Sequence, residues 1–354
     1  MSEVDLAIAG GGIAGCALAI AMARAGWSVV VLERDLAPRT RPGEMLSPAA
    51  RAPLTALGLW PRFTSDEHQP CFEIRAAWGN QQPGRNDFLF NPYGHGWHLD
   101  RAKFVSMLWD TAEAAGARLH RGVTVADAVR NASGWRLVWD GGNVRARFLA
   151  DATGRARRVL RGLPVASRQH DRLICWYGCL PMLEADDATT WIEADSGGWW
   201  YSMPVPGGHM ALAYLTDSPS RPPKCPPGLT RRRLGDLSTW WPRAAPASSS
   251  SPAMAAGTGW IALGDSAAAH DPLSGRGIVH ALTSASRAAE AVSHALMGDD
   301  GALITYAAMQ RRAFDEYLMR RRWYYQAETR WPEREFWWRR QIDFVSEGVS
   351  GKCV

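Results

Sequence analysis

The sequence predicts an α/β fold that combines a parallel sheet built from separated segments, an inserted and mainly antiparallel sheet, and a helical C-terminal tail. Three observations predict it. A buried strand near the start runs into a glycine turn and a helix; strand-like runs without such a motif fill residues 163–254; and residues 301–354 form a helical segment rich in Trp and Arg. With 354 residues, of which 46% are hydrophobic, the chain can bury two cores.

The first element is a buried strand at residues 4–9 that runs into a glycine turn. Gly10, Gly12 and Gly15 occupy this turn, and residues 13–25 continue as a helix. A Cβ atom on these glycines would hold the backbone away from a phosphate, whose charge is stabilised by exposed N–H groups and by the positive end of the helix. The unit therefore predicts a Rossmann-like dinucleotide site, and a plain turn without a ligand is the weaker alternative.

A second strand, over residues 27–32, follows the helix and ends at Glu33. Gly26 separates the two elements, as expected for a residue that ends a helix. Glu33 lies about 20 residues beyond the glycines, at a position where a carboxylate accepts hydrogen bonds from a ribose diol. The acid strengthens the prediction of a dinucleotide.

The later elements alternate between loops, strands and helices. In order, they are a loop over 38–53, sheet over 71–97, a helix capped by Asp100 and ended by Gly116, a strand over 117–120, a hairpin that starts at 135–140 and returns to Asp151, strands over 174–180, 191–193, 199–203 and 210–215, a surface excursion over 216–255, a strand over 260–263, and a helix over 277–296.

Two further motifs follow the glycine turn at long intervals. Asp151-Ala152-Thr153-Gly154 closes a strand in the middle of the chain, and Gly264-Asp265 follows a late strand, ahead of Pro272, Gly275 and Gly277. Taken alone, Asp265 is typical of a helix cap or turn, and Asp151 with Gly154 is typical of a plain turn. All three motifs in this order predict FAD.

These motifs imply three parts of the chain. We expect an FAD-binding domain from residues 1–70, 98–162 and 255–300, a substrate domain from 71–97 and 163–254, and a C-terminal helical, Trp- and Arg-rich segment over 301–354.

The motif order resembles the class A flavoprotein monooxygenases, the para-hydroxybenzoate hydroxylase-like group, over residues 1–300. The resemblance implies that Asp265 bonds the ribityl chain, that residues 272–277 pass beneath the isoalloxazine ring, and that Glu33 holds the adenosine ribose. Arg101 would lie near the pyrophosphate and ribityl chain. The expected FAD-binding residues are Gly10, Gly12, Ile13, Ala14, Gly15, Glu33, Arg34, Arg41, Arg101, Val125 (through its backbone, to adenine), Asp151, Gly154, Asp265, Pro272, Gly275, Gly277 and Ile278, the last where many members have Asn.

The resemblance implies hydroxylation of an electron-rich aromatic molecule. Reduced FAD reacts with O2 to give a C4a-hydroperoxide, whose distal oxygen the substrate attacks. A base near the substrate could assist, and the candidates are Glu73, Asp195 and His209, although His209 also fits a plain turn after Pro206-Gly207-Gly208. Only one glycine fingerprint is present, so NADH, NADPH and a separate reductase all remain open as the source of electrons.

Halogenation is the alternative reaction. The stretch Gly198-Trp199-Trp200-Tyr201-Ser202-Met203-Pro204 resembles the Trp-rich strand of flavin-dependent halogenases, and the Gly43-Glu44 pair is shared with them. That resemblance implies a lysine early in the chain, between flavin and substrate. The three lysines are Lys103, Lys224 and Lys352, and residues 72–78, where the lysine is expected, offer Glu73 and Arg75 instead. Arginine cannot supply a neutral amine. A flavin-binding maturation factor without catalysis is a further alternative.

The C-terminal tail resembles a narrower subgroup, together with Arg41-Pro42-Gly43-Glu44 and residues 72–79. These stretches are similar to flavoproteins that mature quinone-containing amine dehydrogenases and LodA-like amino-acid oxidases by hydroxylating a tryptophan within a partner polypeptide. The resemblance implies an indole substrate within a polypeptide that becomes a quinone enzyme. A small aromatic molecule remains the alternative substrate. The tail's aromatic residues could bind that partner or pack on the FAD domain; they are Trp323, Tyr324, Tyr325, Trp331, Phe336, Trp337 and Trp338.

Composition excludes several other classes. The net charge is +5 and the pI about 9.0, but no helix outside the tail has a continuous basic face with interleaved aromatics, so we expect no nucleic-acid binding. Residues 7–23 lack charge, yet their glycines favour a strand and helix over a membrane span. The six cysteines lack the spacing of metal ligands, which predicts an enzyme without a metal. The first residues do not resemble a signal peptide, which predicts a cytoplasmic location.

Overall fold

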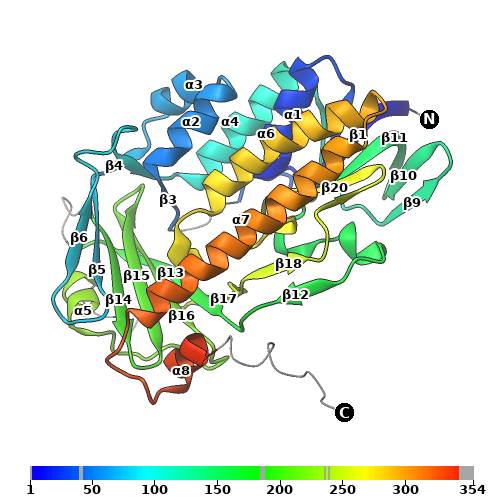
Figure 1. The fold of residues 1–354 in the computed structure, drawn as a ribbon. Coiled ribbons are helices and arrows are strands. Elements are labelled where there is room, and N and C mark those ends of the chain that lie inside the picture. Colours follow the sequence, from blue (N-terminus) through cyan, green and yellow to red (C-terminus); the bar gives the residue numbers. More distant parts are fainter. Residues whose placement is uncertain (1, 40–42, 184–187, 235–236, 238–239, 343–354) are drawn as a thin grey trace, which may run out of the picture.

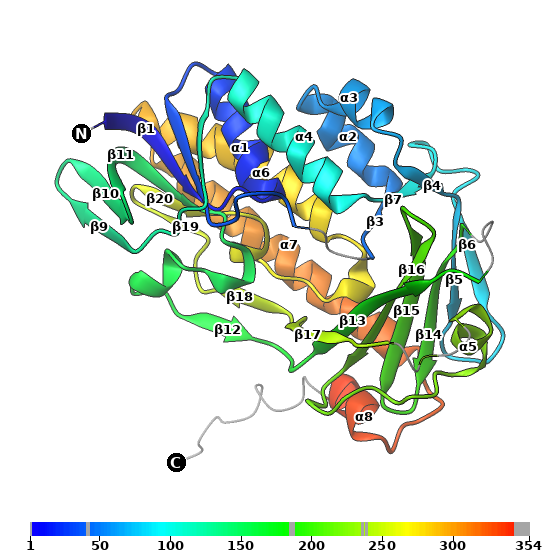
Figure 2. The same ribbon diagram turned by 180° about the vertical axis from the view of Figure 1, so that it is seen from behind.

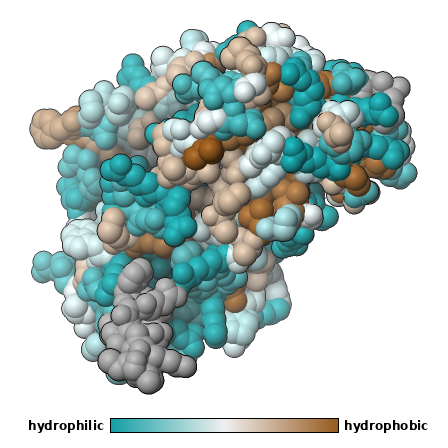
Figure 3. Space-filling model, turned by 45° about the vertical axis from the view of Figure 1, so that its right-hand side comes forward, coloured by the Kyte–Doolittle hydropathy of each residue, from teal (hydrophilic) through white to brown (hydrophobic). Residues whose placement is uncertain are grey.

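A computed structural model describes residues 2–39, 43–183, 188–234, 237 and 240–342. Two sheets lie at opposite ends of the molecule, and long helices cover the first sheet and run toward the second (Figure 1). Seen from behind, the second sheet is flanked by the short C-terminal helix (Figure 2). Apolar side chains on the face drawn in Figure 3 form separate patches between hydrophilic ones.

The first sheet has eight strands in the order β19-β20-β11-β1-β2-β8, with β10 and β9 added beside β11. The pairs that join β20, β11, β1, β2 and β8 are all parallel. Parallel strands are buried on both faces, which explains the continuous apolar runs that predicted them. The strands are β1 (Ser2–Ala9), β2 (Val29–Glu33), β8 (Arg118–Arg121), β9 (Asp127–Asn131), β10 (Gly134–Trp139), β11 (Gly142–Asp151), β19 (Ala256–Gly257) and β20 (Trp260–Ala262).

Four long helices pack with this sheet and with one another. Helix α1 contacts α4 and α6, and α6 contacts α7. Leu18, Ala19 and Ile20 of α1 are fully buried, as expected for a helix covered on all sides. The helices are α1 (Ile13–Arg24), α4 (Arg101–Ala114, capped by Asp100), α6 (Gly277–Leu296) and α7 (Gly301–Gln326).

The second sheet has seven strands in the order β17-β13-β16-β15-β14-β5-β6. All its pairs are antiparallel except that of β14 with β5. The strands are β5 (Glu73–Ala77), β6 (Gly84–Asp87), β13 (Ile174–Pro181), β14 (Thr190–Asp195), β15 (Gly198–Val205), β16 (His209–Thr216) and β17 (Arg243–Pro246). Because side chains alternate between faces, the sheet has an inner face that includes Tyr201 and Ala213 and an outer face that includes Trp200 and Tyr214.

Shorter elements connect these parts. Strand β7 pairs with β3 and β4 in a small third sheet, and β12 pairs with β18. The elements are β3 (Met45–Leu46), β4 (Gln69–Cys71), β7 (Gly96–His98), β12 (Ser167–Gln169), β18 (Ser250–Pro252), α2 (Arg51–Ala56), α3 (Trp60–Ser65), α5 (Gly228–Leu234), α8 (Glu335–Ile342) and the 3-10 helices η1 (Pro48–Ala50), η2 (Gly154–Ala156), η3 (Leu160–Gly162), η4 (Gly264–Ser266) and η5 (Pro272–Ser274).

The α/β fold with an inserted, mainly antiparallel sheet and C-terminal helices is confirmed. The domain boundaries themselves stay a prediction. Two expectations about elements were wrong. Residues 216–255 are not only a surface excursion, because Ser249 is fully buried and Ser250 bonds Ala269 through both backbone groups. The supposed loop over 38–53 contains β3, η1 and the start of α2.

The aromatic residues of the tail divide into two groups. Tyr325, Phe336 and Trp337 are buried in one cluster with Trp199 and Leu215 of the second sheet, rather than against the first, and Trp331 packs partly buried against this cluster. Trp323, Tyr324 and Trp338 remain at least half exposed. In the described part of the chain, no helix is long and apolar enough to span a bilayer.

Candidate functional site

The three sequence motifs meet at one edge of the first sheet. Ala9 pairs with Asp151, and Asp151 pairs with Ala262, so the carboxyl ends of β1, β11 and β20 are level. On the other side of β1, Leu32 pairs with Ala9 and places Glu33 at the same edge. In parallel α/β sheets, ligands bind beyond the carboxyl ends of the strands. The sheet therefore gathers residues that lie far apart in the sequence.

The glycine turn lets the backbone bend sharply between β1 and α1. Gly10 has φ +102°, and a Cβ there would lie 2.5 Å from the Ala152 carbonyl oxygen. A Cβ on Gly15 would lie 1.9 Å from the Gly10 oxygen, whereas one on Gly12 would meet no atom within 4 Å. Helix α1 begins with neither a side-chain cap nor an acidic residue in its first turn. Its first N–H groups, including those of Ile13 and Ala14, are thus suited to a phosphate.

Glu33 lies directly beside this turn. Its Oε2 accepts a hydrogen bond from Gly11 N at 2.6 Å, and its Oε1 accepts one from Asp35 N at 2.9 Å. A carboxylate has about four acceptor sites, so capacity for a diol remains. Val123 N donates to the Glu33 carbonyl, and Val125 follows in a partly buried segment. Arg34, also expected to bind FAD, is half exposed, and its Nε lies 3.8 Å from Asp35 Oδ1.

Asp151 joins the middle motif to the late one. Its carboxylate is fully buried and accepts hydrogen bonds from Val159 N, Leu160 N and Ser266 Oγ, all at 3.0 Å, and from Thr153 N and Oγ1. The oxygens of Asp151 are therefore occupied within the protein. Gly154 has φ +65°, and the position of its missing Cβ faces open space.

Asp265 lies in a turn that touches the first turn of α1. Gly264 has φ +57°, and a Cβ there would lie 2.8 Å from Ala14 Cβ, so the close approach requires glycine. The Asp265 side chain is 37% exposed, and its Oδ2 lies 3.5 Å from Arg155 Nε. This carboxylate therefore keeps acceptor capacity for a hydroxyl group.

The loop after Asp265 ends at the second uncapped helix. Pro272 starts η5, Gly275 has φ +59°, and α6 begins at Gly277 without a side-chain cap or a first-turn acid. Missing Cβ atoms at Gly275 and Gly277 would meet no atom within 4 Å. Ile278 packs partly buried against the core. The positive end of α6 suits the negative charge of a reduced flavin.

This geometry fits FAD. One uncapped helix is available for a pyrophosphate, Glu33 for a ribose diol, Asp265 for a ribityl hydroxyl and α6 for the ring. Open space at Gly12, Gly154, Gly275 and Gly277 allows the backbone to approach a ligand closely.

Two arginines fix these motifs, and sequence reasoning assigned a role to neither. Arg157 has φ +44°, and its guanidinium donates to Ser266 O, Ser250 Oγ and Ser250 O at 2.8–3.0 Å. Arg155 donates to the carbonyls of Ser248 and His270. Both follow the Asp151-to-Gly154 motif, but the sequence held no signal for their partners, which lie about 90 or more residues away.

A pair of partly buried histidines also went unpredicted. The ring centroids of His270 and His280 are 4.7 Å apart, and a ring nitrogen of His280 lies 3.3 Å from the Gly264 oxygen. Burial lowers the pKa of His270 well below its ordinary value, helped by His280 and Arg276. Burial also lowers the pKa of His280, although Asp265 opposes this shift. Both rings are therefore neutral near pH 7.

Arg101 forms an ion pair instead of standing free. Its Nη1 bonds Glu44 Oε2, and the two side chains are 14% and 29% exposed. Gly43 has φ +84°, and its missing Cβ would lie 3.1 Å from Ala211 Cβ on the inner face of the second sheet. The Arg101–Glu44 pair therefore lies next to a residue that contacts the inner face of the second sheet. Arg41 lies outside the described residues.

The three candidate bases do not gather at this site. Burial would raise the pKa of Glu73, but hydrogen bonds from Arg75 and Arg85 outweigh it and hold the pKa below the ordinary value. Asp195 accepts from Trp200 Nε1 at 2.7 Å and from the Tyr214 hydroxyl at 3.1 Å.

Strand alternation places Glu73 and Asp195 on the outer face, whereas Leu273 of the late motif packs against the inner one. His209 is exposed at a hairpin end, with Nδ1 2.8 Å from the Gly207 oxygen. Their role as a base stays a prediction.

The inner face of the second sheet is mainly apolar. Ile192 and Tyr201 pair across β14 and β15, and Ala213 pairs with Tyr201 from β16; all three belong to the cluster that Leu273 joins. Ala76 pairs with Ile192, so β5 presents Ile74 and Ala76 on this face. Lys103 Nζ donates to the Asp66 carbonyl at 2.6 Å, and Lys224 is exposed in a loop. Neither lysine lies on β5.

Known proteins match this chain over nearly all of its length. A family model described as "FAD dependent oxidoreductase" matches residues 5–60, and one described as "Tryptophan halogenase" matches residues 65–348. The putative FAD-dependent oxidoreductase LodB of Marinomonas mediterranea is 25% identical over 96% of this chain and 97% of its own.

Two solved structures share the fold. The myxobacterial chondrochloren halogenase CndH has a TM-score of 0.84 at 22% identity, covering 98% of this chain and 88% of its own. The peptidyl tryptophan dihydroxylase QhpG, described as essential for tryptophylquinone cofactor biogenesis, has a TM-score of 0.79 at 23% identity, covering 99% of this chain and 82% of its own.

Proposed function

The chain belongs to the tryptophan halogenase family of flavin-dependent enzymes that modify aromatic rings, and on that premise we propose that it hydroxylates the indole of a tryptophan within a partner polypeptide. Membership of this family accounts for the use of a flavin and for an aromatic substrate. The choice of hydroxylation over halogenation, and of a polypeptide over a small molecule, is our proposal.

One observation carries the choice of hydroxylation. The inner face of β5 presents Ile74 and Ala76, and no lysine precedes Lys103 in the sequence. Resemblance to the halogenases implies a lysine between flavin and substrate, because the halogenating species needs an amine. The charged residues of β5, Glu73 and Arg75, pair with each other on the outer face. Without that amine, direct oxygen transfer to the ring is the chemistry that remains.

One solved structure supports a polypeptide substrate. QhpG is described as a peptidyl tryptophan dihydroxylase, and its match covers 99% of this chain. Indole is an electron-rich ring and therefore suits attack on electrophilic oxygen. The exposed aromatic side chains of Trp323, Tyr324 and Trp338 are of the type that anchors protein partners.

The residues of this chain would perform binding, orientation and the exclusion of water. FAD, once reduced, supplies the activation of O2. The first turn of α1 would hold the pyrophosphate, Glu33 the ribose and Asp265 the ribityl chain, while α6 would stabilise negative charge on the ring. The apolar inner face, with Tyr201 and Ala213, would keep water from the reacting atoms.

The electrons come from outside this site. The chain contains a single glycine fingerprint after its first strand, which the FAD site uses. We therefore propose that a separate reductase, or NAD(P)H bound without such a fingerprint, reduces the flavin.

Mass spectrometry tests the reaction type. The FAD-loaded protein is incubated with a flavin reductase, NADH, O2 and Trp-containing peptides, with and without chloride or bromide. We expect each modified peptide to gain oxygen, whether or not halide is present, and to take up labelled oxygen from 18O2. A halogen-dependent mass gain, or release of hypohalous acid, would instead establish halogenation, which the family match and the fold of CndH favour.

A further inference from the structure

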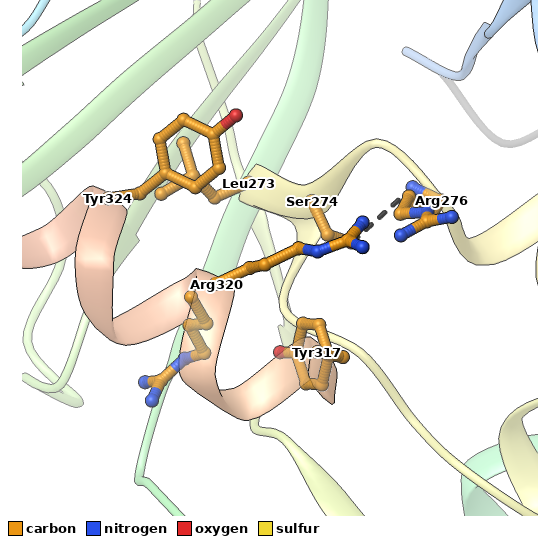
Figure 4. Close-up of a pocket in the computed structure, with 7 residues that line it drawn as sticks. Leu273, Ser274, Arg276, Tyr317, Arg320 and Tyr324 are labelled. Carbon is orange, nitrogen blue, oxygen red and sulfur yellow. Dashed lines mark hydrogen bonds between the residues drawn. The ribbon is translucent and has the colours of Figure 1, made fainter. Parts of the chain in front are cut away.

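A small pocket lies between α7 and the loop that carries Pro272 and Gly275 (Figure 4). Its volume is about 210 Å³. Leu273, Ser274 and Arg276 line it from the loop, while α7 contributes Arg320 and Tyr324 at the rim and Tyr317 and Arg321 below them. The proposed function assigns no role to this pocket.

The base of the pocket is held rigidly by buried charges. Arg321 Nε lies 3.1 Å from Asp271 Oδ2, and Arg321 Nη2 lies 3.1 Å from Asp171 Oδ2. The Tyr317 hydroxyl accepts a hydrogen bond from Asp271 N at 2.7 Å. The charge of Arg321 is therefore balanced within the protein, and the pocket is preformed.

The rim, by contrast, carries unbalanced positive charge. Arg276 and Arg320 are both exposed, and within the described ranges neither lies within ion-pair distance of a carboxylate. None of the seven lining residues is acidic. Guanidinium groups bind carboxylates through two parallel hydrogen bonds, so the rim is complementary to an acidic group.

The size of the pocket limits its ligand. Whole small-molecule and cofactor sites usually enclose about 300–1,000 Å³. At about 210 Å³, this pocket is better suited to one side chain than to a cofactor.

An apolar surface continues beside the rim on α7. Met319 and Trp323 are 66% and 65% exposed, and the Trp323 and Tyr324 rings are 5.0 Å apart. Trp, Tyr and Arg are the residues that contribute most to binding energy at protein interfaces. The pocket and this surface together form one basic and aromatic site.

We propose that the pocket anchors an acidic side chain of the polypeptide substrate, with Trp323 and Tyr324 covering the apolar residues next to it. The inference rests on the proposed function and adds the chemistry by which the partner is recognised. The loop side of the pocket includes Ser274 and Arg276, so the partner would dock against the same loop that we expect beneath the flavin ring.

Peptide binding tests this proposal. The probe is a fluorescein-labelled peptide in which tryptophan is flanked by glutamates within a Gly-Ser frame, compared with its glutamine counterpart by fluorescence anisotropy at low ionic strength. We expect the FAD-loaded wild-type protein to bind the glutamate peptide more tightly, and Arg320→Glu to lose about tenfold in affinity for it. Arg320 is exposed, so the variant should keep its FAD and its thermal midpoint.

Arg312→Glu is the matched control. It makes the same charge change on the same helix, at a side chain that is 84% exposed and pairs with Glu316. Equal weakening by Arg312→Glu, or equal binding of the two peptides by wild type, would overturn the proposal. Inorganic phosphate serves as a competitor: if it binds at Arg320 while the peptide does not, the pocket is a small-anion site and the proposal is wrong. Peptide binding at Arg320 without any oxygen insertion would instead reject the proposed function alone.

Discussion

Gly10 and Gly12 lie two residues apart, and the structure gives each a different reason to be glycine. Gly10 combines a left-handed backbone with a contact that leaves no room for a Cβ beside Ala152. Gly12 faces open space, so a side chain there would contact a bound ligand but no nearby protein atom. The fold therefore accounts for the first glycine, and we propose that the cofactor accounts for the second.

This difference predicts opposite outcomes for two alanine variants. Gly12→Ala should leave the thermal midpoint of the apoprotein close to that of wild type, yet weaken FAD binding by about tenfold or more, because a methyl group would displace the pyrophosphate. Gly10→Ala should lower the free energy of unfolding by at least about 2 kcal/mol, owing to backbone strain and collision. Differential scanning fluorimetry and FAD titration measure both. The assignment is wrong if Gly12→Ala binds FAD as wild type does.

His270 gives the protein a predictable sensitivity to acid. Its pKa is lowered in the folded state, chiefly by burial, whereas in the unfolded chain it titrates near about 6.5. The unfolded state therefore binds more protons below that pH, and the free energy of unfolding falls as pH drops, by up to about 1.4 kcal/mol per pH unit for this histidine.

Urea unfolding between pH about 7.5 and 5.5 should show this dependence, and His270→Gln should reduce its slope. Carboxylates with lowered pKa values, such as Glu73, also make stability depend on pH, but in a more acidic range. Their contribution cancels when the slope of the variant is subtracted from that of wild type. Equal slopes for His270→Gln and wild type would contradict the prediction.

At the scale of elements, α8 anchors the tail to the second sheet through one of two adjacent tryptophans. Trp337 is fully buried, its Nε1 donates to the Asp195 carbonyl at 2.8 Å, and it lies in one cluster with Trp199. Trp338 is 50% exposed. A tail that looks uniformly aromatic in sequence therefore has a buried side and an exposed side.

Replacing each tryptophan with alanine tests which of the two stabilises the fold. Trp337→Ala should reduce the free energy of unfolding by about 3–5 kcal/mol, because it leaves a large cavity. Trp338→Ala should change it by less than about 0.5 kcal/mol. Urea denaturation of both variants checks the expectation, and similar values would show that α8 does not pack on the sheet in solution.

At the scale of the whole molecule, α7 joins the two sheets. It contacts α6 along one part of its length, and Tyr325 near its end lies among the inner-face residues of the second sheet. Between these contacts, Arg321 bridges Asp271 and Asp171. Burial disfavours the charge on Arg321, but the two carboxylates outweigh it and raise its pKa.

Arg321→Met should therefore destabilise the whole fold. It would leave two carboxylates buried without their counter-ion, at a cost of about 3–5 kcal/mol. Arg320→Met, one position earlier and exposed, should have little effect. Chemical denaturation followed by both far-UV circular dichroism and tryptophan fluorescence measures the change. A loss of less than about 1 kcal/mol for Arg321→Met would mean that the bridge contributes little.

The sequence predicted those features whose signals are local. The helix Gly277–Leu296 was expected over the same residues, and Asp100 caps α4 as its position indicated. Residues 248–250 belong to the stretch expected as a surface excursion because it is rich in Pro, Ser and Arg, yet they are buried, and Ser249 and Ser250 bond Asp171, Arg157 and Ala269. Those partners are distant in sequence, so no local pattern could reveal them. Likewise, the position of Glu73 and Asp195 on the outer face of the second sheet follows from strand pairing, which the sequence does not reveal.

The connectivity of the two sheets has a consequence for synthesis of the protein. β1 needs β11, in which Leu6 meets Phe148, and β5 needs β14, in which Ala76 meets Ile192. β1 can pair early with β2, and β5 with β6, but the second neighbour of each strand leaves the ribosome only after a long stretch of later chain, and such distant pairing is slow. Each nascent sheet would therefore keep one open strand edge during synthesis, so chaperones and slow translation at low temperature should raise the yield of folded protein.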